Sequence, residues 1–253
     1  MLSYVTLALA ALFLPLFPFS MVFNLLLSRV QRGWQRGLII LLWPHIGIGL
    51  LHVADIQVSP WVAVWGVLTA LLYAARALGL RDMGAWMGFI VTSSWALLWV
   101  AEAFGPGGEL THLYAVTFAV PLVLFALLGE GLTRRYGAAY TGLYVGLASS
   151  LPRFSLVLVL VVLAAVATPL FPGFFAMLAL MLDTVPHSTA TAVALALVWL
   201  LWSGAGMRLL TDLIVGQPGS TEVSDLGYAS TSGFLVGLGS LVIAGLYLVG
   251  GMS

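Results

Sequence analysis

One long apolar stretch, residues 152–182, constrains the fold most, because it is longer than the apolar face of a soluble helix allows. A helix needs roughly 20 apolar residues to cross a bilayer, so this stretch can span one. It is interrupted by Pro169, Pro172 and Gly173. Since proline removes a backbone donor and clashes with the preceding turn, we expect the helix to break there. Broken membrane helices need protein or a water-filled cavity to satisfy the freed backbone groups, and they are typical of ion pathways.

The composition places the whole chain in a membrane. Of its 253 residues, 62% are hydrophobic and 7% are charged, whereas soluble domains carry about 25% charged residues. The absence of cysteine excludes disulfides and thiolate chemistry. The nine cations are all arginine, and the zero net charge gives no reason to expect a nucleic-acid partner.

We therefore predict an all-α polytopic bundle of about eight transmembrane spans, each of roughly 20 residues. It would form a single membrane domain over residues 1–253, with no domain outside the membrane. The first span has a break of its own at Pro15 and Pro18, which predicts a second discontinuous helix. Prolines are also common in ordinary membrane helices, so this reading stays open. The expected spans are 3–27, 37–54, 61–80, 84–103, 112–133, 153–183 (the broken one), 189–210 and 231–251.

The arginines predict the orientation of the chain. They follow the first, third, fifth and seventh spans, whereas the intervening loops carry acids and no arginine. Because cationic loops stay in the cytoplasm, both termini should lie outside, which in a bacterium is the periplasmic side of the inner (plasma) membrane. The loop with Glu222 and Asp225 is an acidic exception on the cytoplasmic side.

Four stretches carry motifs that agree with one family in order and spacing. PFSMVFN (residues 18–24) is similar to P-V-S-A-L-x-H, and TALLYAARALGLRD (69–82) to TAL-x-x-A-x-x-A-L-x-x-x-D. HLYAVTFAVPLVLFALLG (112–129) has the outline of a helix ending F-F-K-A-L-L-F-x-x-x-G, and PLFPGFFAM (169–177) is similar to P-P-L-A-G-F-W-S-K. The chain thus resembles the antiporter-like membrane subunits of respiratory complex I, which Mrp-type cation/proton antiporters and the DabB subunit of inorganic-carbon uptake systems share.

The resemblance covers the C-terminal part of that family, from its first broken helix to its end. It implies a shortened antiporter-like subunit that works beside other membrane subunits. The partner could be a full-length antiporter-like protein or, as in inorganic-carbon uptake, a lysine-rich relative with a soluble, zinc-containing catalytic subunit.

The family moves protons along ionisable side chains at mid-membrane, and this sequence has replaced them. The family's histidine after the first break falls at Asn24, and the lysine of its Asp-x-Lys motif at Gly84. The F-F-K lysine falls at Pro121, and the lysine or glutamate after the second break at Met177. A buried lysine relays protons because desolvation brings its pKa toward neutrality, and none of these four residues can do so. The resemblance therefore implies that this proton path is lost.

The remaining proton-path candidates are His45, His52, Arg76, Asp82 and His112. His45 and His52 lie seven residues apart on one helix face and could pass protons through water, since histidine titrates near physiological pH. Alternatively, each donates a hydrogen bond to a neighbouring helix. Arg76 would extend to the interface, and Asp82, which matches the family aspartate, would cap the following helix. His112 lies one residue from a position where the family pattern can have histidine.

Other polar residues have mainly structural interpretations. Glu130 and Arg134 form a favourable pair four residues apart on one helix. Asp183 and His187 would sit in a solvated turn, or guard an exit. We expect the tryptophans of the fourth span to face lipid or a partner subunit; they are Trp86, Trp95 and Trp99.

Three functions follow. The first is a structural or modulatory subunit of a proton-coupled complex, which could be complex I-like, Mrp-like or an inorganic-carbon uptake system. The second is a subunit that still conducts protons or cations through residual histidines and water at the broken helices. The third, an independent small-molecule carrier, needs a polar site at mid-membrane that the sequence does not offer. No metal-ligand spacing or nucleophile–base pattern occurs, so we expect no metal, no cofactor and no enzymatic activity from the chain alone.

Overall fold

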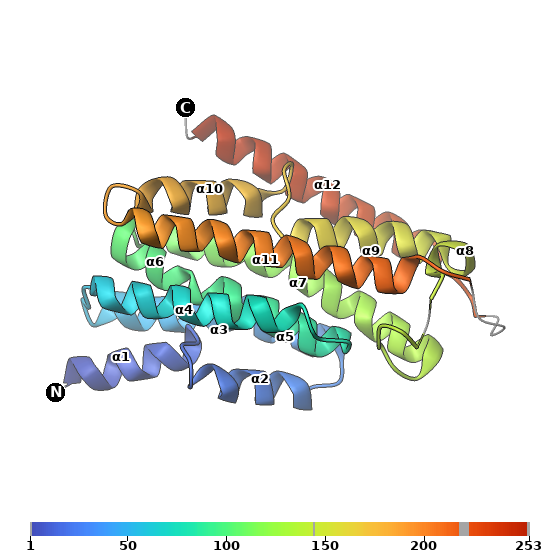
Figure 1. The fold of residues 1–253 in the computed structure, drawn as a ribbon, viewed down its shortest axis with the longest axis horizontal. Helices are drawn as coiled ribbons and strands as arrows, with labels where there is room; N and C mark the ends of the chain where they lie inside the picture. The colour runs from blue at the N-terminus through green and yellow to red at the C-terminus, as the bar shows by residue number, and fades with distance from the viewer. Residues whose placement is uncertain (1, 144, 218–222, 252–253) are drawn as a thin grey trace.

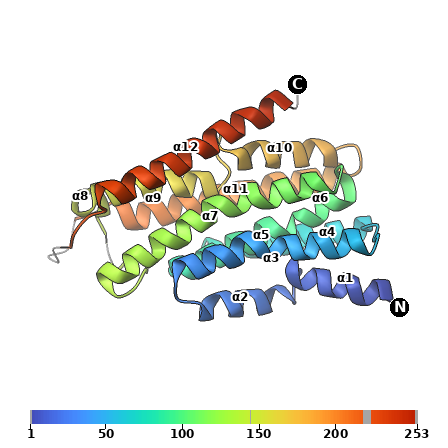
Figure 2. The same cartoon turned by 180° about the vertical axis from the view of Figure 1, so that it is seen from behind.

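The structure, a computed structural model, describes residues 2–143, 145–217 and 223–251. In these residues the secondary structure is helical, apart from an isolated bridge between Asp82 and Tyr140. The helices lie side by side along the long axis of the molecule (Figures 1 and 2). This confirms the predicted all-α polytopic bundle.

Most passages through the bundle are continuous. Six candidate spans are long and apolar enough to cross a membrane. The span over residues 83–104 has a short interruption at Leu97, which the sequence did not predict. Pro44 and Pro121, by contrast, sit inside unbroken helices. These spans are α3 (Gly33–Val53), α4 (Pro60–Ala77), α5 (Met83–Ala96) with α6 (Leu98–Phe104), α7 (Glu109–Tyr136), α11 (Thr189–Ile214) and α12 (Tyr228–Gly251).

Two further passages are broken, where the prolines predicted. The first consists of α1 (Leu2–Phe13) and α2 (Ser20–Arg29), which are separated by residues 14–19, here named break 1. The second consists of α9 (Pro152–Ala165) and α10 (Pro172–Thr184), which are separated by residues 166–171, here named break 2. A short helix, α8 (Leu147–Ser150), precedes α9. With the six candidate spans, these make the eight passages expected for the described residues.

The two breaks have different neighbours. The α1–α2 passage forms one edge of the bundle and packs on α3 and α5 (Figures 1 and 2). The α9–α10 passage lies between α7, α11 and α12, and α12 crosses it at break 2. Break 1 is therefore at the periphery of this chain, whereas break 2 is overlaid by a helix of the same chain.

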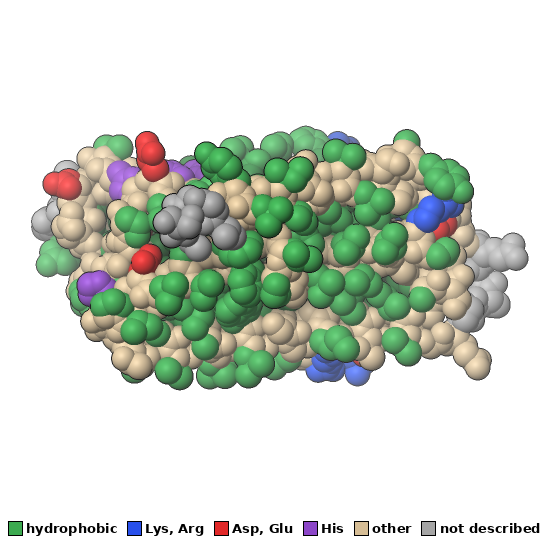
Figure 3. Space-filling model, turned by 90° about the horizontal axis from the view of Figure 1, so that it is seen from above, with side chains coloured by type: hydrophobic (Ala, Val, Ile, Leu, Met, Phe, Trp, Pro, Cys, Tyr) green, Lys and Arg blue, Asp and Glu red, His purple; other side chains and the backbone are tan. Residues whose placement is uncertain are grey.

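Charged residues separate into two ends. All nine arginines lie where α2, α4, α7 and α11 end or where α3 and α9 begin, and we name this the arginine end. The four histidines lie toward the other end, the histidine end, together with Asp55, Glu102, Glu109 and Asp183. Figure 3 shows histidines and acids at one extremity and arginines toward the other. The orientation inferred from these arginines stays a prediction.

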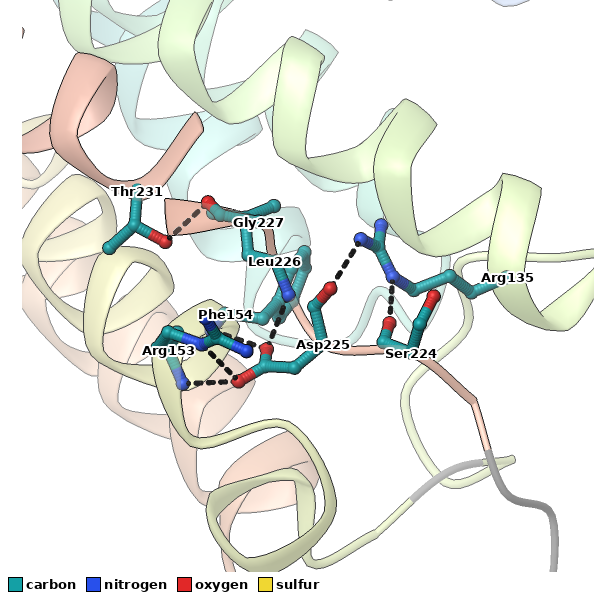
Figure 4. A network of polar contacts seen from close by, with 8 residues as sticks. All are labelled: Arg135, Arg153, Phe154, Ser224, Asp225, Leu226, Gly227 and Thr231. Atoms are coloured by element: carbon teal, nitrogen blue, oxygen red, sulfur yellow. Dashed lines mark hydrogen bonds and ion pairs between the residues drawn. The ribbon is translucent and has the colours of Figure 1, made fainter. Parts of the chain in front are cut away.

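The acidic loop before α12 is neutralised by its neighbours. The Asp225 carboxylate accepts hydrogen bonds from the backbone N–H groups of Arg153 at 2.9 Å and Phe154 at 3.1 Å, and from Arg153 Nε at 3.2 Å (Figure 4). Arg135 donates to the Ser224 carbonyl at 2.8 Å. These contacts attach the start of α12 to α9 and α7, which explains an acid at the arginine end. Glu222 lies outside the described residues.

Burial and hydrogen bonding act in opposite directions on Asp225. Burial raises the pKa of its carboxyl. Hydrogen bonds from the backbone N–H groups of Arg153, Leu226 and Phe154 and from the Arg153 side chain lower the pKa, and together they outweigh burial. The net pKa lies below the usual value for aspartate. The carboxylate stands at the N-terminus of α9, where a negative charge is favoured by the helix dipole.

The tryptophans of the fourth passage do not face lipid or the outside of this chain. Trp86 is 1% exposed, and Trp95 and Trp99 are both 0% exposed. The expectation from the sequence was wrong because this passage is apolar on every side, so its sequence has no periodicity that marks a buried face. It is covered by α2, α4 and α7.

Candidate functional site

Three histidines from two helices meet at the histidine end. His45 and His112 approach through their Nδ1 atoms at 2.7 Å, with stacked rings. The His52 ring meets that of His112 edge-on, at 6.0 Å between centroids. His52 Nε2 lies 3.2 Å from Glu102 Oε2 on α6. The structure thus brings together the three predicted histidines and adds Glu102, which the sequence did not link to them.

This histidine cluster, formed by His45, His52, His112 and Glu102, consists of a histidine pair and a histidine–carboxylate pair that meet at the edge-on contact of His52 with His112. His52 is at the surface, with a side chain 37% exposed, whereas the Glu102 side chain is 7% exposed. One carboxylate oxygen, Glu102 Oε1, is buried without a hydrogen-bond partner in the described residues. Protons could therefore enter at His52 and reach His45, which lies deeper in the bundle.

A polar pocket opens at the other end of the molecule. It has a volume of about 390 Å³, and Arg36, Asp82, Gly84 and Glu130 are among its lining residues. Asp82 Oδ1 accepts a hydrogen bond from the N–H of Ala85 at 2.6 Å, which is the helix cap predicted from the sequence. Glu130 accepts from the backbone N–H of Gly33 at 2.7 Å and from Arg134 at 2.5 Å.

The pocket shows the surroundings of Gly84, where the sequence resemblance implied that a lysine is replaced. A Cβ added at Gly84 would lie 2.9 Å from Arg36 Nη1 and 3.1 Å from Asp82 Oδ1. The Arg36 guanidinium is held by a hydrogen bond from Nε to the Val30 carbonyl at 2.6 Å. An arginine remains protonated in proteins, so it supplies charge here without exchanging protons.

Polar side chains continue inward from the arginine end to Asn24. An adjoining pocket of about 320 Å³ is lined by Asn24, Arg36 and Asp82. The Asn24 amide donates to the Ser20 carbonyl at 3.0 Å and to Thr92 Oγ1 at 2.8 Å. Ser20 Oγ in turn lies 2.8 Å from the Tyr73 hydroxyl. These are neutral groups that hold the start of α2 to α4 and α5.

Aromatic rings separate this polar region from the histidine cluster. Trp43 contacts Phe13 at 4.9 Å and Phe23 at 5.7 Å between ring centroids, and Phe23 contacts Trp95 at 4.8 Å. We name these four residues the aromatic barrier. Phe23 precedes Asn24 in α2, and Trp43 lies two residues before His45 in α3, so the barrier lies between the two polar regions. Phe23 and Trp95 are 0% exposed.

Tryptophan side chains satisfy the carbonyl groups that break 1 frees. An indole N–H is a donor that cannot accept a proton, so each of these contacts is closed to proton transfer. The three donations are from Trp43 to the Leu12 carbonyl at 3.2 Å, from Trp99 to Leu14 at 2.9 Å and from Trp65 to Phe17 at 2.9 Å. On the donor side of break 1, the N–H of Phe17 is bonded to Thr69 Oγ1 at 3.1 Å.

At break 2, too, an indole N–H donates to a freed carbonyl, and two residues have strained backbone angles. Trp199 Nε1 donates to the Ala167 carbonyl at 3.0 Å, and Thr168 Oγ1 donates to the Leu163 carbonyl at 2.9 Å. Ala167 and Leu170 have positive φ angles of 56° and 90°, which non-glycine residues rarely adopt. The spacing of the tryptophans in the sequence gave no signal for these roles, because each donor comes from a different passage than its acceptor.

The other predicted residues lie away from the histidine cluster. Arg76 is at the arginine end, 5.8 Å from the centre of the Phe89 ring. Pro121 and Met177 are buried, in α7 and α10. His187 stacks on Phe104 at 5.2 Å. In the described part of the chain, no group of three or more His, Asp or Glu side chains is arranged to hold a metal ion.

The sequence matches no family pattern and no curated relative, but the fold matches solved structures. A chain of respiratory complex I from Thermus thermophilus has a TM-score of 0.85 and 19% identity over 97% of this chain and 54% of that one. A chain of the Mrp complex from Dietzia sp. DQ12-45-1b has a TM-score of 0.77 and 19% identity over 88% and 44%. A chain of the membrane-bound sulfane sulfur reductase, an archaeal respiratory membrane complex, has a TM-score of 0.82 and 14% identity. The match covers 94% of this chain and 51% of that one.

The chain spans about half the length of these solved chains. At such identities the likeness shows the fold, and it is the fold that the sequence resemblance implied. Two of the three complexes, complex I and Mrp, are those in which the resemblance placed the chain.

Proposed function

We propose that this chain is a structural or modulatory membrane subunit of a multi-subunit, proton-coupled complex, and that it does not itself conduct protons. The observation that carries this proposal is the aromatic barrier. It lies between the polar pocket at the arginine end and the histidine cluster, and its apolar rings offer no group that could take up a proton between them.

The four replaced positions support the same proposal. Asn24 is tied into hydrogen bonds with Ser20 and Thr92, and Gly84 faces a permanently charged arginine. Pro121 and Met177 are packed in the core. Ionisable residues are costly inside membranes and persist mainly where they are used, so their replacement indicates that this path is not in use.

The host complex and the orientation are part of the proposal. The host is a complex I-like dehydrogenase, an Mrp-like antiporter or a proton-driven inorganic-carbon uptake system. The chain would lie in the bacterial inner membrane with both termini on the periplasmic side, since its arginines gather at the opposite end. Its partners would be other membrane subunits, among them a full-length antiporter-like protein, or a soluble catalytic subunit.

Purification from its native membrane in mild detergent tests this function. The proposal predicts that a tagged chain elutes in a stable assembly with at least one other membrane protein at constant stoichiometry. Elution as a free monomer, at detergent concentrations that leave other membrane complexes intact, would contradict it.

The alternative function is conduction of protons or cations, and the histidine cluster favours it. The 2.7 Å contact between His45 and His112, with His52 at the surface beside the buried Glu102 carboxylate, would carry protons into the bundle. Under this alternative, replacing His45 and His52 together with alanine in the assembled complex abolishes ion transport. Under the leading proposal, transport by the complex is unchanged.

A further inference from the structure

The hydrogen bond between His45 and His112 limits how many protons the two rings can hold. Their Nδ1 atoms lie 2.7 Å apart, and this contact has room for one proton, which one ring donates and the other accepts. A neutral histidine has one ring N–H, whereas a charged histidine has an N–H on both ring nitrogens. The pair can therefore take up one further proton, on the Nε2 atom of the donor ring, and keep its hydrogen bond.

A second added proton has no such place. It would go to the Nδ1 atom that accepts the hydrogen bond, and two N–H groups would then point at each other across 2.7 Å. The two rings would also both be positively charged, and like charges in contact disfavour the second protonation. The pair therefore holds one positive charge and must separate to hold two.

The neighbouring members of the histidine cluster do not remove this limit. Glu102 Oε2 lies 3.2 Å from His52 Nε2, so the Glu102 charge is matched by that histidine once it is protonated. A protonated His52 would add to the repulsion, because its ring meets the His112 ring edge-on at 6.0 Å between centroids. In the part of the chain that the structure describes, no ion pair includes His45 or His112.

The other titratable groups at the histidine end are further from the pair than an ion pair allows. The tyrosines among them are neutral near pH 7. The acids favour the first positive charge on the pair, but none lies between the two rings, so none separates two charges in contact. These groups are Tyr4 on α1, Asp55 after α3, Glu109 and Tyr114 on α7, Asp183 on α10 and His187 in the turn after it.

The pair joins two helices that touch directly nearer the arginine end. A Cβ at Gly33 of α3 would lie 2.7 Å from the Ala126 carbonyl oxygen of α7, and one at Gly37 would lie 2.9 Å from Val123 Cγ1. Glycines allow this approach, as small residues do between membrane helices. The histidine pair lies further along the same two helices, toward the start of α7. Separation of the rings would therefore spread the two helices at the histidine end and leave the arginine end packed.

From this geometry we infer that the contact between His45 and His112 is a pH-sensitive latch between α3 and α7. The latch is closed when the pair carries no charge or one, and it opens when both rings are charged. Because His52 at the edge of the cluster is exposed, the latch responds to the pH on the side of the membrane that the histidine end faces. It needs no proton to cross the membrane, so it is independent of the proposed function.

Thermal unfolding of the purified chain in mild detergent tests the latch. The closed pair excludes a proton that the separated histidines of the unfolded chain accept, so stability should fall as the pH drops below about 6.5, the ordinary pKa of histidine. The wild-type Tm should fall by about 3 °C more than that of His112→Gln between about pH 7.5 and pH 5. A glutamine amide can bond to a neutral or a charged His45, so this variant has no latch to open.

His187→Gln is the matched control, since His187 lies at the same end and stacks on Phe104 instead of joining the cluster. It should keep the pH dependence of the wild type. The latch is overturned if His112→Gln keeps that dependence as well, or if the wild-type Tm falls no more than that of His112→Gln.

Nitrogen-15 NMR of the wild-type chain with labelled histidine gives a second readout, which holds even if His112→Gln does not fold. The chain has four histidines, so the spectrum contains few signals. The latch predicts that two of them titrate together in two steps, separated by more than about one pH unit. Four independent single-step titrations would show that the rings do not share a proton and would overturn the latch.

Discussion

Break 1 and break 2 both free backbone carbonyl groups inside an apolar passage, but they differ in how far this chain covers them. Both interrupt an apolar passage, and both have carbonyl groups that accept hydrogen bonds from indoles. Break 2 is completed by α12 of the same chain, which approaches through Gly245. Break 1 has residues 17–19 exposed at the edge of the bundle.

The difference separates two properties that a broken helix can have. At both breaks indole N–H groups donate to carbonyl groups, and an indole N–H cannot itself accept a proton. Each break is approached by a glycine of another helix, break 1 by Gly47 of α3 and break 2 by Gly245 of α12. Break 2 is therefore overlaid by a helix of this chain, whereas residues 17–19 of break 1 remain exposed.

The largest effect should come from forcing α12 off break 2. In Gly245→Leu, the added side chain would meet backbone atoms of Leu170 and Pro172 that cannot move aside. We expect a loss of about 3 kcal/mol in the free energy of unfolding, measured by thermal unfolding in mild detergent. Gly239→Leu on the same helix is the matched control, because a Cβ there meets nothing within 4 Å. Equal losses in the two variants would show that α12 does not cover the break.

The next effect concerns the indole donors at break 1. In Trp99→Phe, the buried Leu14 carbonyl loses its partner, which should lower the free energy of unfolding by about 2 kcal/mol. Trp86→Phe is the control, since the Trp86 indole N–H is buried without a partner in the described residues and its removal leaves no group unpaired. If Trp99→Phe and Trp86→Phe lose the same free energy of unfolding, the indole hydrogen bonds are not what stabilises break 1.

A smaller loss of stability should follow from weakening the Asp225 hydrogen bonds that attach the start of α12 to α9. Asp225→Asn weakens the hydrogen bonds to Arg153 and Phe154, and we expect a loss of about 1 kcal/mol at pH 7. Because the pKa of Asp225 is lower in the folded chain than in the unfolded one, its contribution is fully present above the unfolded value and is lost as the pH falls through the folded value.

The gap in Tm between wild type and Asp225→Asn should therefore be full at pH 7 and shrink below about pH 3.9, the ordinary pKa of aspartate. Asp212→Asn serves as the control, since its pair with Arg208 is exposed and 3.8 Å long. Such a pair contributes little. A gap that stays constant down to pH 2 would mean that the Asp225 charge does not hold α12 in place.

The passages and both breaks could be predicted from the sequence, because hydropathy and proline act locally. The ends of the helices were less accurate: α7 runs from Glu109 to Tyr136, beyond the expected 112–133. Asp82 could be assigned as a cap from its place before a helix. These predictions needed only neighbours along the chain.

Contacts between distant passages could not be predicted from one sequence. Nothing local connects His112 or Glu102 with the histidines of α3, and nothing indicates that Arg36 faces Gly84. The tryptophans of the fourth passage were misjudged for the same reason. An indole that serves a carbonyl of another helix looks, in sequence, like one that faces lipid.

Proton flux through the purified chain in liposomes tests the central claim most directly. With a potassium diffusion potential and an internal pH-sensitive dye, vesicles that contain the chain should acidify no faster than protein-free vesicles. Acidification that is clearly faster, and that disappears when His45 and His52 are both replaced with alanine, would contradict the account and show that the aromatic barrier is open.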